Sequence, residues 1–81
     1  MPKSLRSQRD MALRGLLRQA RLDAGLTQSD LAARLDRPQS YVAKIENSER
    51  RIDVAEFLDI AQALDCDACA ILRTVQRLHA T

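Results

Sequence analysis

Two short stretches of the sequence carry strong signals for the start of a helix. In "TQSDL", Thr27 can act as the N-cap, and the carboxylate of Asp30 can bond back to the cap residue. In "IDVAEF", Asp53 and Glu56 stand in the same relation. An apolar pair brackets each cap as a hydrophobic staple: Leu26 with Leu31, and Ile52 with Phe57. A chain with two such starts is expected to pack helices against each other.

A long helix is expected before the first of these starts, over about residues 7–24. The apolar residues of this segment recur at steps of three and four: Leu13, Leu17, Ala20 and Ala24. Arg14 and Arg18 lie off this apolar stripe. Gly25 follows, and it suits the left-handed conformation that closes many helices.

Between the two starts, a further helix is expected to begin at Pro38. Proline suits the first helical position because no backbone N–H is needed there. Val42 and Ile45 then face inward, which leaves a mostly polar set on the other faces: Gln39, Ser40, Ala43, Lys44 and Asn47. The preceding turn, "LDRP", has the length that a helix-turn-helix uses.

The last part of the chain predicts two more helix boundaries. Asp65 must replace the usual glycine at the exit of the helix that begins near Val54. Asp67 can cap a final helix over residues 67–80. One apolar edge of that helix has few partners left within the chain: Ile71, Leu72, Val75 and Leu78.

The chain of 81 residues has room for one small core, so one domain over residues 1–81 is expected. Its composition favours helix over strand, which predicts an all-α fold. Residues 1–6 are expected to form a flexible arm. No apolar run approaches the roughly twenty residues of a membrane span, and the first residues lack the apolar core of a signal peptide. A soluble, cytoplasmic protein without a membrane partner is therefore expected.

Charge divides unevenly along the chain. Residues 1–52 carry 11 Lys and Arg against 6 Asp and Glu, whereas residues 53–81 carry 2 against 5. A basic half in a small domain favours a polyanion as partner, with nucleic acid the commonest. A solvated helix face is the alternative explanation.

The sequence offers little for catalysis or for a metal. It has one histidine, His79, and no glycine-rich phosphate loop or Ser/His/Asp set, so an enzyme is not expected. Cys66 and Cys69 form a C-x-x-C, but one chain cannot supply the four ligands of a structural zinc site. Packing is the favoured role for Cys66, ahead of a metal or redox role. No cofactor and no metal are expected.

From residue 17 to about residue 72, the sequence resembles the Cro and Xre-like helix-turn-helix regulators. This family includes small phage repressors and restriction-modification controller proteins. The resemblance is carried by "LRQARLDAGLTQSDLAARL", "SYVAKIENSER" and "LDIAQALDC" in this order. It implies a five-helix lambda-repressor-like bundle, with the helix near residue 38 in the major groove and the preceding helix across the DNA backbone.

The resemblance also implies roles for individual residues. Four match positions that face bases in relatives: Pro38, Gln39, Ser40 and Lys44. Glutamine can pair bidentately with adenine and lysine can donate to guanine, so Gln39 and Lys44 are the expected specificity residues. Six are expected to contact the DNA backbone: Gln28, Arg37, Tyr41, Asn47, Arg50 and Arg51. An exposed helix-start residue and a basic loop are the plain alternatives for Gln28 and the arginines.

Arg21 and Glu46 match an ion pair that ties the first helix to the end of the reading helix in relatives, and a structural role is expected for them. The sequence departs from the family at Pro38, which replaces a hydroxyl cap. It also departs at Ser48 and Asp65, which replace glycines, and at the link "DCDAC".

The expected function is sequence-specific binding of double-stranded DNA by a transcriptional regulator. One helix-turn-helix reads only a few base pairs, so a homodimer on a palindromic operator is expected, with the apolar edge of the last helix as its contact. The alternative is a protein-interaction module of the same fold, such as an antitoxin or an adaptor.

Overall fold

The computed structural model describes residues 7–78, which form five helices and no strand. They are α1 (Gln8–Asp23), α2 (Gln28–Arg34), α3 (Gln39–Glu46), α4 (Val54–Ala63) and α5 (Ala68–Gln76). The expected all-α, five-helix architecture is thereby confirmed. The expected arm at residues 1–6, the position of His79 and the last residues of the final helix lie outside the described part of the chain.

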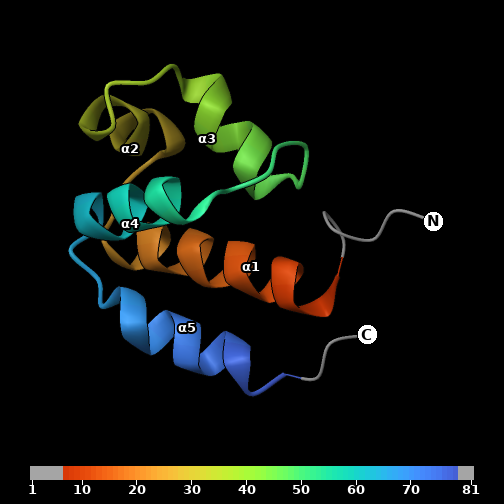
Figure 1. Ribbon diagram of the computed structural model, residues 1–81. Helices are drawn as coiled ribbons and strands as arrows, with labels where there is room; N and C mark the ends of the chain where they lie inside the picture. The colour runs from red at the N-terminus through yellow and green to blue at the C-terminus, as the bar shows by residue number, and fades with distance from the viewer. Residues whose placement is uncertain (1–6, 79–81) are drawn as a thin grey trace.

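The helices enclose one core. In Figure 1, α2 and α3 pack together on one side of α1 and α4, and α5 lies on the other side of α1. The largest cluster of buried side chains includes Leu17, Leu31, Val42, Ile45, Phe57 and Ile60, from α1 to α4. Burying a side chain of this size contributes roughly 1.5–3 kcal/mol. Val42 and Ile45 face inward as expected, so the polar side of α3 is left to solvent.

Side-chain caps fix where the helices begin. Thr27 Oγ1 accepts from the Asp30 amide at 3.0 Å, and the Asp30 carboxylate accepts from the Thr27 amide at 2.9 Å. Asp53 and Glu56 form the second capping box, at 2.7 and 3.1 Å. The outer staple residues, Leu26 and Ile52, pack against the core. Both helix starts are therefore confirmed.

Left-handed residues end the helices. Gly25 has a φ of 74° and Asp65 a φ of 55°, both at the expected positions. Ser48, which follows α3, has a φ of 60°. Asp36, in the turn between α2 and α3, also has a positive φ of 56°, which the sequence did not predict. Each non-glycine residue in this region carries backbone strain, least for aspartate because its side chain can bond locally.

The sequence predicted Pro38 as the first residue of α3, but the structure places it one position before the helix. It occupies the N-cap, with φ −71° and ψ 155°, and offers no side chain to the exposed amides of the first turn. The extended ψ explains the shift by one position, because a cap residue lies outside the helical region. The helix α3 therefore begins at Gln39.

Arg14 is also placed differently from the expectation. Its side chain is 3% exposed although it lies off the apolar stripe of α1. The guanidinium donates to Asp10 at 2.6 Å and to the backbone carbonyl of Ile45 at 2.5 Å. These two acceptors allow a charged residue into a position that the apolar pattern alone assigns to solvent.

The final helix ends earlier than predicted, at Gln76. Arg9 of α1 donates to the carbonyl of Gln76 at 3.1 Å and to that of Leu78 at 2.8 Å. A guanidinium on these terminal carbonyls satisfies acceptors that have no partner inside the helix. Arg9 thus fixes the end of α5 on α1.

Candidate nucleic-acid interface

One side of α3 presents polar side chains to solvent. Gln39, Ser40 and Lys44 are all exposed, and Pro38 is exposed just before them. Because Val42 and Ile45 are buried on the opposite side, α3 cannot rotate about its axis without exposing the core. The four residues expected to face bases therefore share an accessible surface.

Hydrogen bonds tie Gln39 to the rest of the helix-turn-helix. Its Nε2 donates to Gln28 Oε1 at 2.7 Å, and Gln28 Nε2 donates to Glu46 Oε1 at 2.9 Å. Gln28 is the first residue of α2, whereas Gln39 and Glu46 are the first and last residues of α3. This relay connects both ends of α3 through one side chain of α2.

The relay has a defined direction because an ionised carboxylate can only accept hydrogen bonds. Gln28 must turn its amide nitrogen toward Glu46, which leaves its oxygen for Gln39. Gln39 must then donate to Gln28 and keeps its own oxygen and a second N–H for another partner. One acceptor and one donor on a planar amide are what bidentate recognition of adenine requires.

Glu46 is also held by a buried ion pair with Arg21. Arg21 Nε lies 2.7 Å from Glu46 Oε2, and both side chains are 7% exposed. A second guanidinium nitrogen donates to Glu46 Oε1 at 3.0 Å, and the third donates to the carbonyl of Leu26 at 2.8 Å. Arg18 adds a longer contact to Glu46 at 3.8 Å. The pair joins α1 to the end of α3, as the resemblance implied.

Tyr41 forms a second cluster, with arginines on its ring. The guanidinium carbons of Arg37 and Arg50 lie 4.9 and 4.7 Å from the ring centroid. Arg50 also pairs with Glu56 at 2.8 Å. Arg50 is thereby fixed next to Tyr41 by a residue of α4.

The contacts in this cluster shift the pKa values of Tyr41 and Glu56. Burial, followed by the charge of Glu56 and the hydrogen bond to it, raises the pKa of Tyr41 above its ordinary value. The hydrogen bond from Arg50 lowers the pKa of Glu56. Tyr41, which the resemblance matches to a backbone-contact position, is buried, and the guanidinium groups of Arg37 and Arg50 lie over its ring. The tyrosine therefore acts here as a support for two cations.

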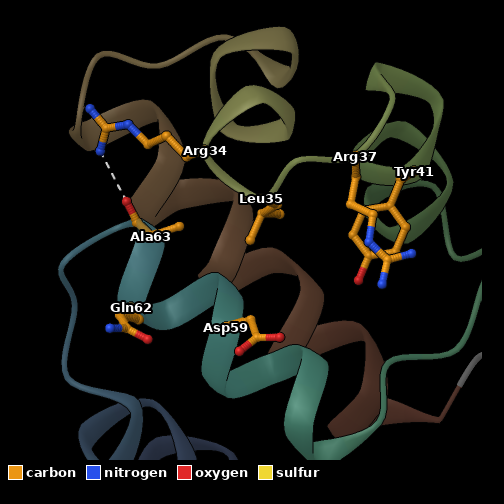
Figure 2. A pocket seen from close by; sticks show the side chains of 7 residues that line it. All are labelled: Arg34, Leu35, Arg37, Tyr41, Asp59, Gln62 and Ala63. Atoms are coloured by element: carbon orange, nitrogen blue, oxygen red, sulfur yellow. Dashed lines mark hydrogen bonds between the residues drawn. The ribbon is translucent and has the colours of Figure 1, made fainter.

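A hollow of about 370 Å³ lies beside this cluster, between α2, the start of α3, and α4 (Figure 2). Arg37 and Tyr41 stand together on one side, and Asp59 of α4 lies opposite them. Arg34 donates to the carbonyl of Ala63 at 2.9 Å. The remaining lining residues are Leu35 and Gln62. Arg37 is thus exposed at the turn that leads into α3.

The other expected backbone-contact residues follow α3. Asn47 is exposed at the C-cap, and Arg51 is exposed in the connection to α4. Together with Arg50 they surround the end of α3, whereas Gln28 and Arg37 belong to α2 and to the turn before α3. The structure thus distributes these polar and cationic side chains along α3 from its beginning to its end.

The comparisons with known proteins agree with this geometry. A family model for the helix-turn-helix matches residues 17–71. An XRE-family like protein from Pseudomonas syringae pv. tomato has a similar structure, with a TM-score of 0.81 and 51% identity over 84% of this chain and 83% of that chain. The chain belongs to the Xre-like helix-turn-helix family. A search among curated proteins finds no match.

Restriction-modification controller proteins share the fold of this Xre-like chain. C.AhdI from Aeromonas hydrophila has a TM-score of 0.69 and 30% identity, over 75% of this chain and 92% of that chain. The controller C.Esp1396I, as a tetramer in complex with its natural 35 base-pair operator, has a TM-score of 0.72 and 21% identity. That likeness covers 82% of this chain and 87% of that chain.

The C-x-x-C is divided between two environments. Cys66 is half-buried and packs against the core, and burial raises the pKa of its thiol, with Asp67 adding to the shift. Cys69 is exposed on the first turn of α5. Within residues 7–78, no three potential ligands among His, Cys, Asp and Glu come close enough to hold a metal ion. In the same residues, no helix has the length and apolarity of a membrane span.

Proposed function

We propose that this chain is a sequence-specific regulator of transcription that reads double-stranded DNA with α3. The observation that carries the proposal is the relay from Glu46 through Gln28 to Gln39. It leaves one acceptor and one donor of an exposed amide directed away from the protein, on the helix that enters the major groove in this family. Lys44 lies on the same exposed side and can donate to guanine.

The donors around α3 support the proposed backbone contacts. Arg37, Asn47 and Arg51 are exposed near the two ends of α3, and Arg50 is partly exposed. Gln28, although partly committed to the relay, keeps a second amide N–H for a phosphate. We assign the phosphates to these five residues. Tyr41 contributes indirectly, because its ring holds Arg37 and Arg50 in place.

A homodimer on a palindromic site completes the proposal, because a single α3 spans only a few base pairs. Of the apolar edge proposed for the contact, Val75 is buried and Ile71 packs against the core of its own chain. Leu78 is partly buried, and Leu72 is 46% exposed. The two-fold contact is therefore centred on Leu72.

The dimer is tested by sedimentation of the chain carrying Leu72→Glu. A charge on a buried two-fold axis faces its own copy, so this variant is expected to be monomeric. Leu22→Glu is a matched control, since Leu22 is 44% exposed on α1. A dimer that survives Leu72→Glu contradicts the proposed contact.

The proposed function is tested by selecting bound duplexes from a random DNA pool with the unaltered chain. An enriched palindrome with half-sites about one helical turn apart is the expected result. The affinity for that duplex should fall steeply with added salt, by about one power of the salt concentration for each phosphate neutralised. If no sequence is enriched and a stable complex with another protein forms in cell extract, an interaction module of the same fold replaces this proposal.

A further inference from the structure

Arg14 lies in a setting that does not favour stability. Its side chain is 3% exposed, and Asp10, the carboxylate that pairs with it, is itself 17% exposed. One guanidinium nitrogen, Nη2, is buried without a hydrogen-bond partner among the described residues. A buried cation with an unsatisfied donor is costly, and replacing a buried ion pair by apolar side chains of similar volume is often neutral or stabilising.

In this position Arg14 forms a hydrogen bond to the main chain of α3. Its Nη1 donates to the carbonyl of Ile45, in the last turn of that helix. This carbonyl also accepts from the amide of Ser48 at 3.2 Å, and the cation opposes the negative end of the helix dipole. Because the bond is to the backbone, it fixes the position of α3 and not only that of one side chain.

Arg14 and Arg21 act on the same end of α3. They are two turns apart on α1, so they share one face of that helix. Arg21 holds the side chain of Glu46, and Arg14 holds the carbonyl of the preceding residue, Ile45. The other end of α3 is held by the bond between Gln28 and Gln39. The reading helix is thus fixed at both ends.

We infer that Arg14 is a positioning residue for base recognition. It sets the angle at which α3 presents Gln39 and Lys44, at some cost in stability. The inference rests on the proposed function and deepens it. Arg14 lies before the residues that match the helix-turn-helix family, 17–71, so that match does not account for it.

The test compares Arg14→Met with the unaltered chain in two assays. Thermal unfolding should occur at nearly the same temperature, because methionine removes an unsatisfied buried donor and the carboxylate that loses its partner, Asp10, is 17% exposed and can be hydrated. The ratio of affinities for the selected duplex and for a scrambled duplex should fall by about tenfold or more, as expected when a base contact in each half-site is misaligned. Arg73→Met, which removes one exposed charge from α5, should leave this ratio unchanged.

A ratio within about twofold of that of the unaltered chain, in a folded Arg14→Met protein, overturns the inference. If Arg14→Met does not fold, Arg14→Lys decides, because lysine keeps the charge but replaces the two guanidinium nitrogens that bond to Asp10 and Ile45 by a single ammonium without the planar fork. The inference is supported if Arg14→Lys folds and its ratio of affinities for the selected and scrambled duplexes falls as expected for Arg14→Met. If Arg14→Lys folds with an unchanged affinity ratio, or if it also fails to fold, Arg14 contributes to stability alone.

The DNA-free chain gives a readout that does not depend on the proposed function. The side-chain amide signals of Gln28 and Gln39 in NMR spectra should shift in Arg14→Met and not in Arg73→Met, because α3 changes its position relative to α2. If no duplex is ever enriched while these signals shift, the regulator proposal fails and the positioning of α3 stands. If the signals do not move, the positioning role fails by itself.

Discussion

Removing Glu46 tests how the buried ion pair contributes to the fold. In Glu46→Ala, the guanidinium of Arg21 loses both carboxylate contacts while its side chain, 7% exposed, stays inside the protein. Breaking a buried pair from one side costs about 3–5 kcal/mol. For a domain of this size, about 4–8 °C in unfolding temperature corresponds to each kcal/mol, so a decrease of at least about 12 °C is expected.

The assay is thermal and urea unfolding followed by circular dichroism, with a control and a rescue. Glu49→Ala removes an exposed carboxylate three residues later and should change stability by less than about 0.5 kcal/mol. Joining Arg21→Met to Glu46→Met removes both charges and should restore most of the loss, because no uncompensated charge remains. A loss below about 1 kcal/mol in Glu46→Ala, as for an exposed pair, refutes the reasoning. So does a double variant that is no more stable than Glu46→Ala.

Three further predictions concern other parts of the structure. Tyr41 is the only tyrosine of the chain, so absorbance titration should report a pKa above 10.0 directly, and Glu56→Gln should bring it closer to 10.0. Because the folded state holds the phenolic proton of Tyr41 more tightly, the raised pKa contributes to stability. This contribution is complete below the pKa of the unfolded state and is lost as the pH rises through the pKa of the folded state. A measured pKa at or below 10.0 contradicts the burial of Tyr41. Ser48→Gly should raise the free energy of unfolding by about 0.5–1 kcal/mol in urea unfolding, because glycine adopts the positive φ without strain; a lower stability contradicts this. Gln28→Ala should relax base preference at the position read by Gln39 in a duplex selection, because the amide of Gln39 is then free to turn over; an unchanged preference there means that the relay does not orient Gln39.

The helix boundaries that depend on contacts between neighbouring residues could be predicted from the sequence. Thr27 and Asp53 determine helix starts through contacts within three residues, so the sequence alone locates them. Gly25 and Asp65 were predicted from position in the same way. The left-handed Asp36 was missed because an aspartate in a short turn has several conformations of similar energy.

Contacts between distant segments were less predictable. The apolar pattern puts Arg14 off the buried stripe of its helix, because periodicity records only the polarity of a residue and not the acceptors that the fold brings to it. The resemblance matches Tyr41 to a backbone-contact position, but the stacking of Arg37 and Arg50 on its ring depends on how the loop after α3 folds back and could not be predicted. Gln28 and Gln39 were both identified as site residues, but the bond between them depends on how α2 and α3 meet. The only sequence signal for the burial of Arg14 was its position beside the apolar stripe of its helix.

The central claim, that α3 reads bases, is tested most directly by repeating the duplex selection with Gln39→Ala and with Lys44→Ala. Each variant is expected to relax the selected sequence at its own base position in both half-sites while the rest of the palindrome persists. Such a result assigns one base to each side chain. Identical selected sequences from the unaltered chain and from both variants would contradict the claim, because the specificity would then come from residues outside the exposed side of α3.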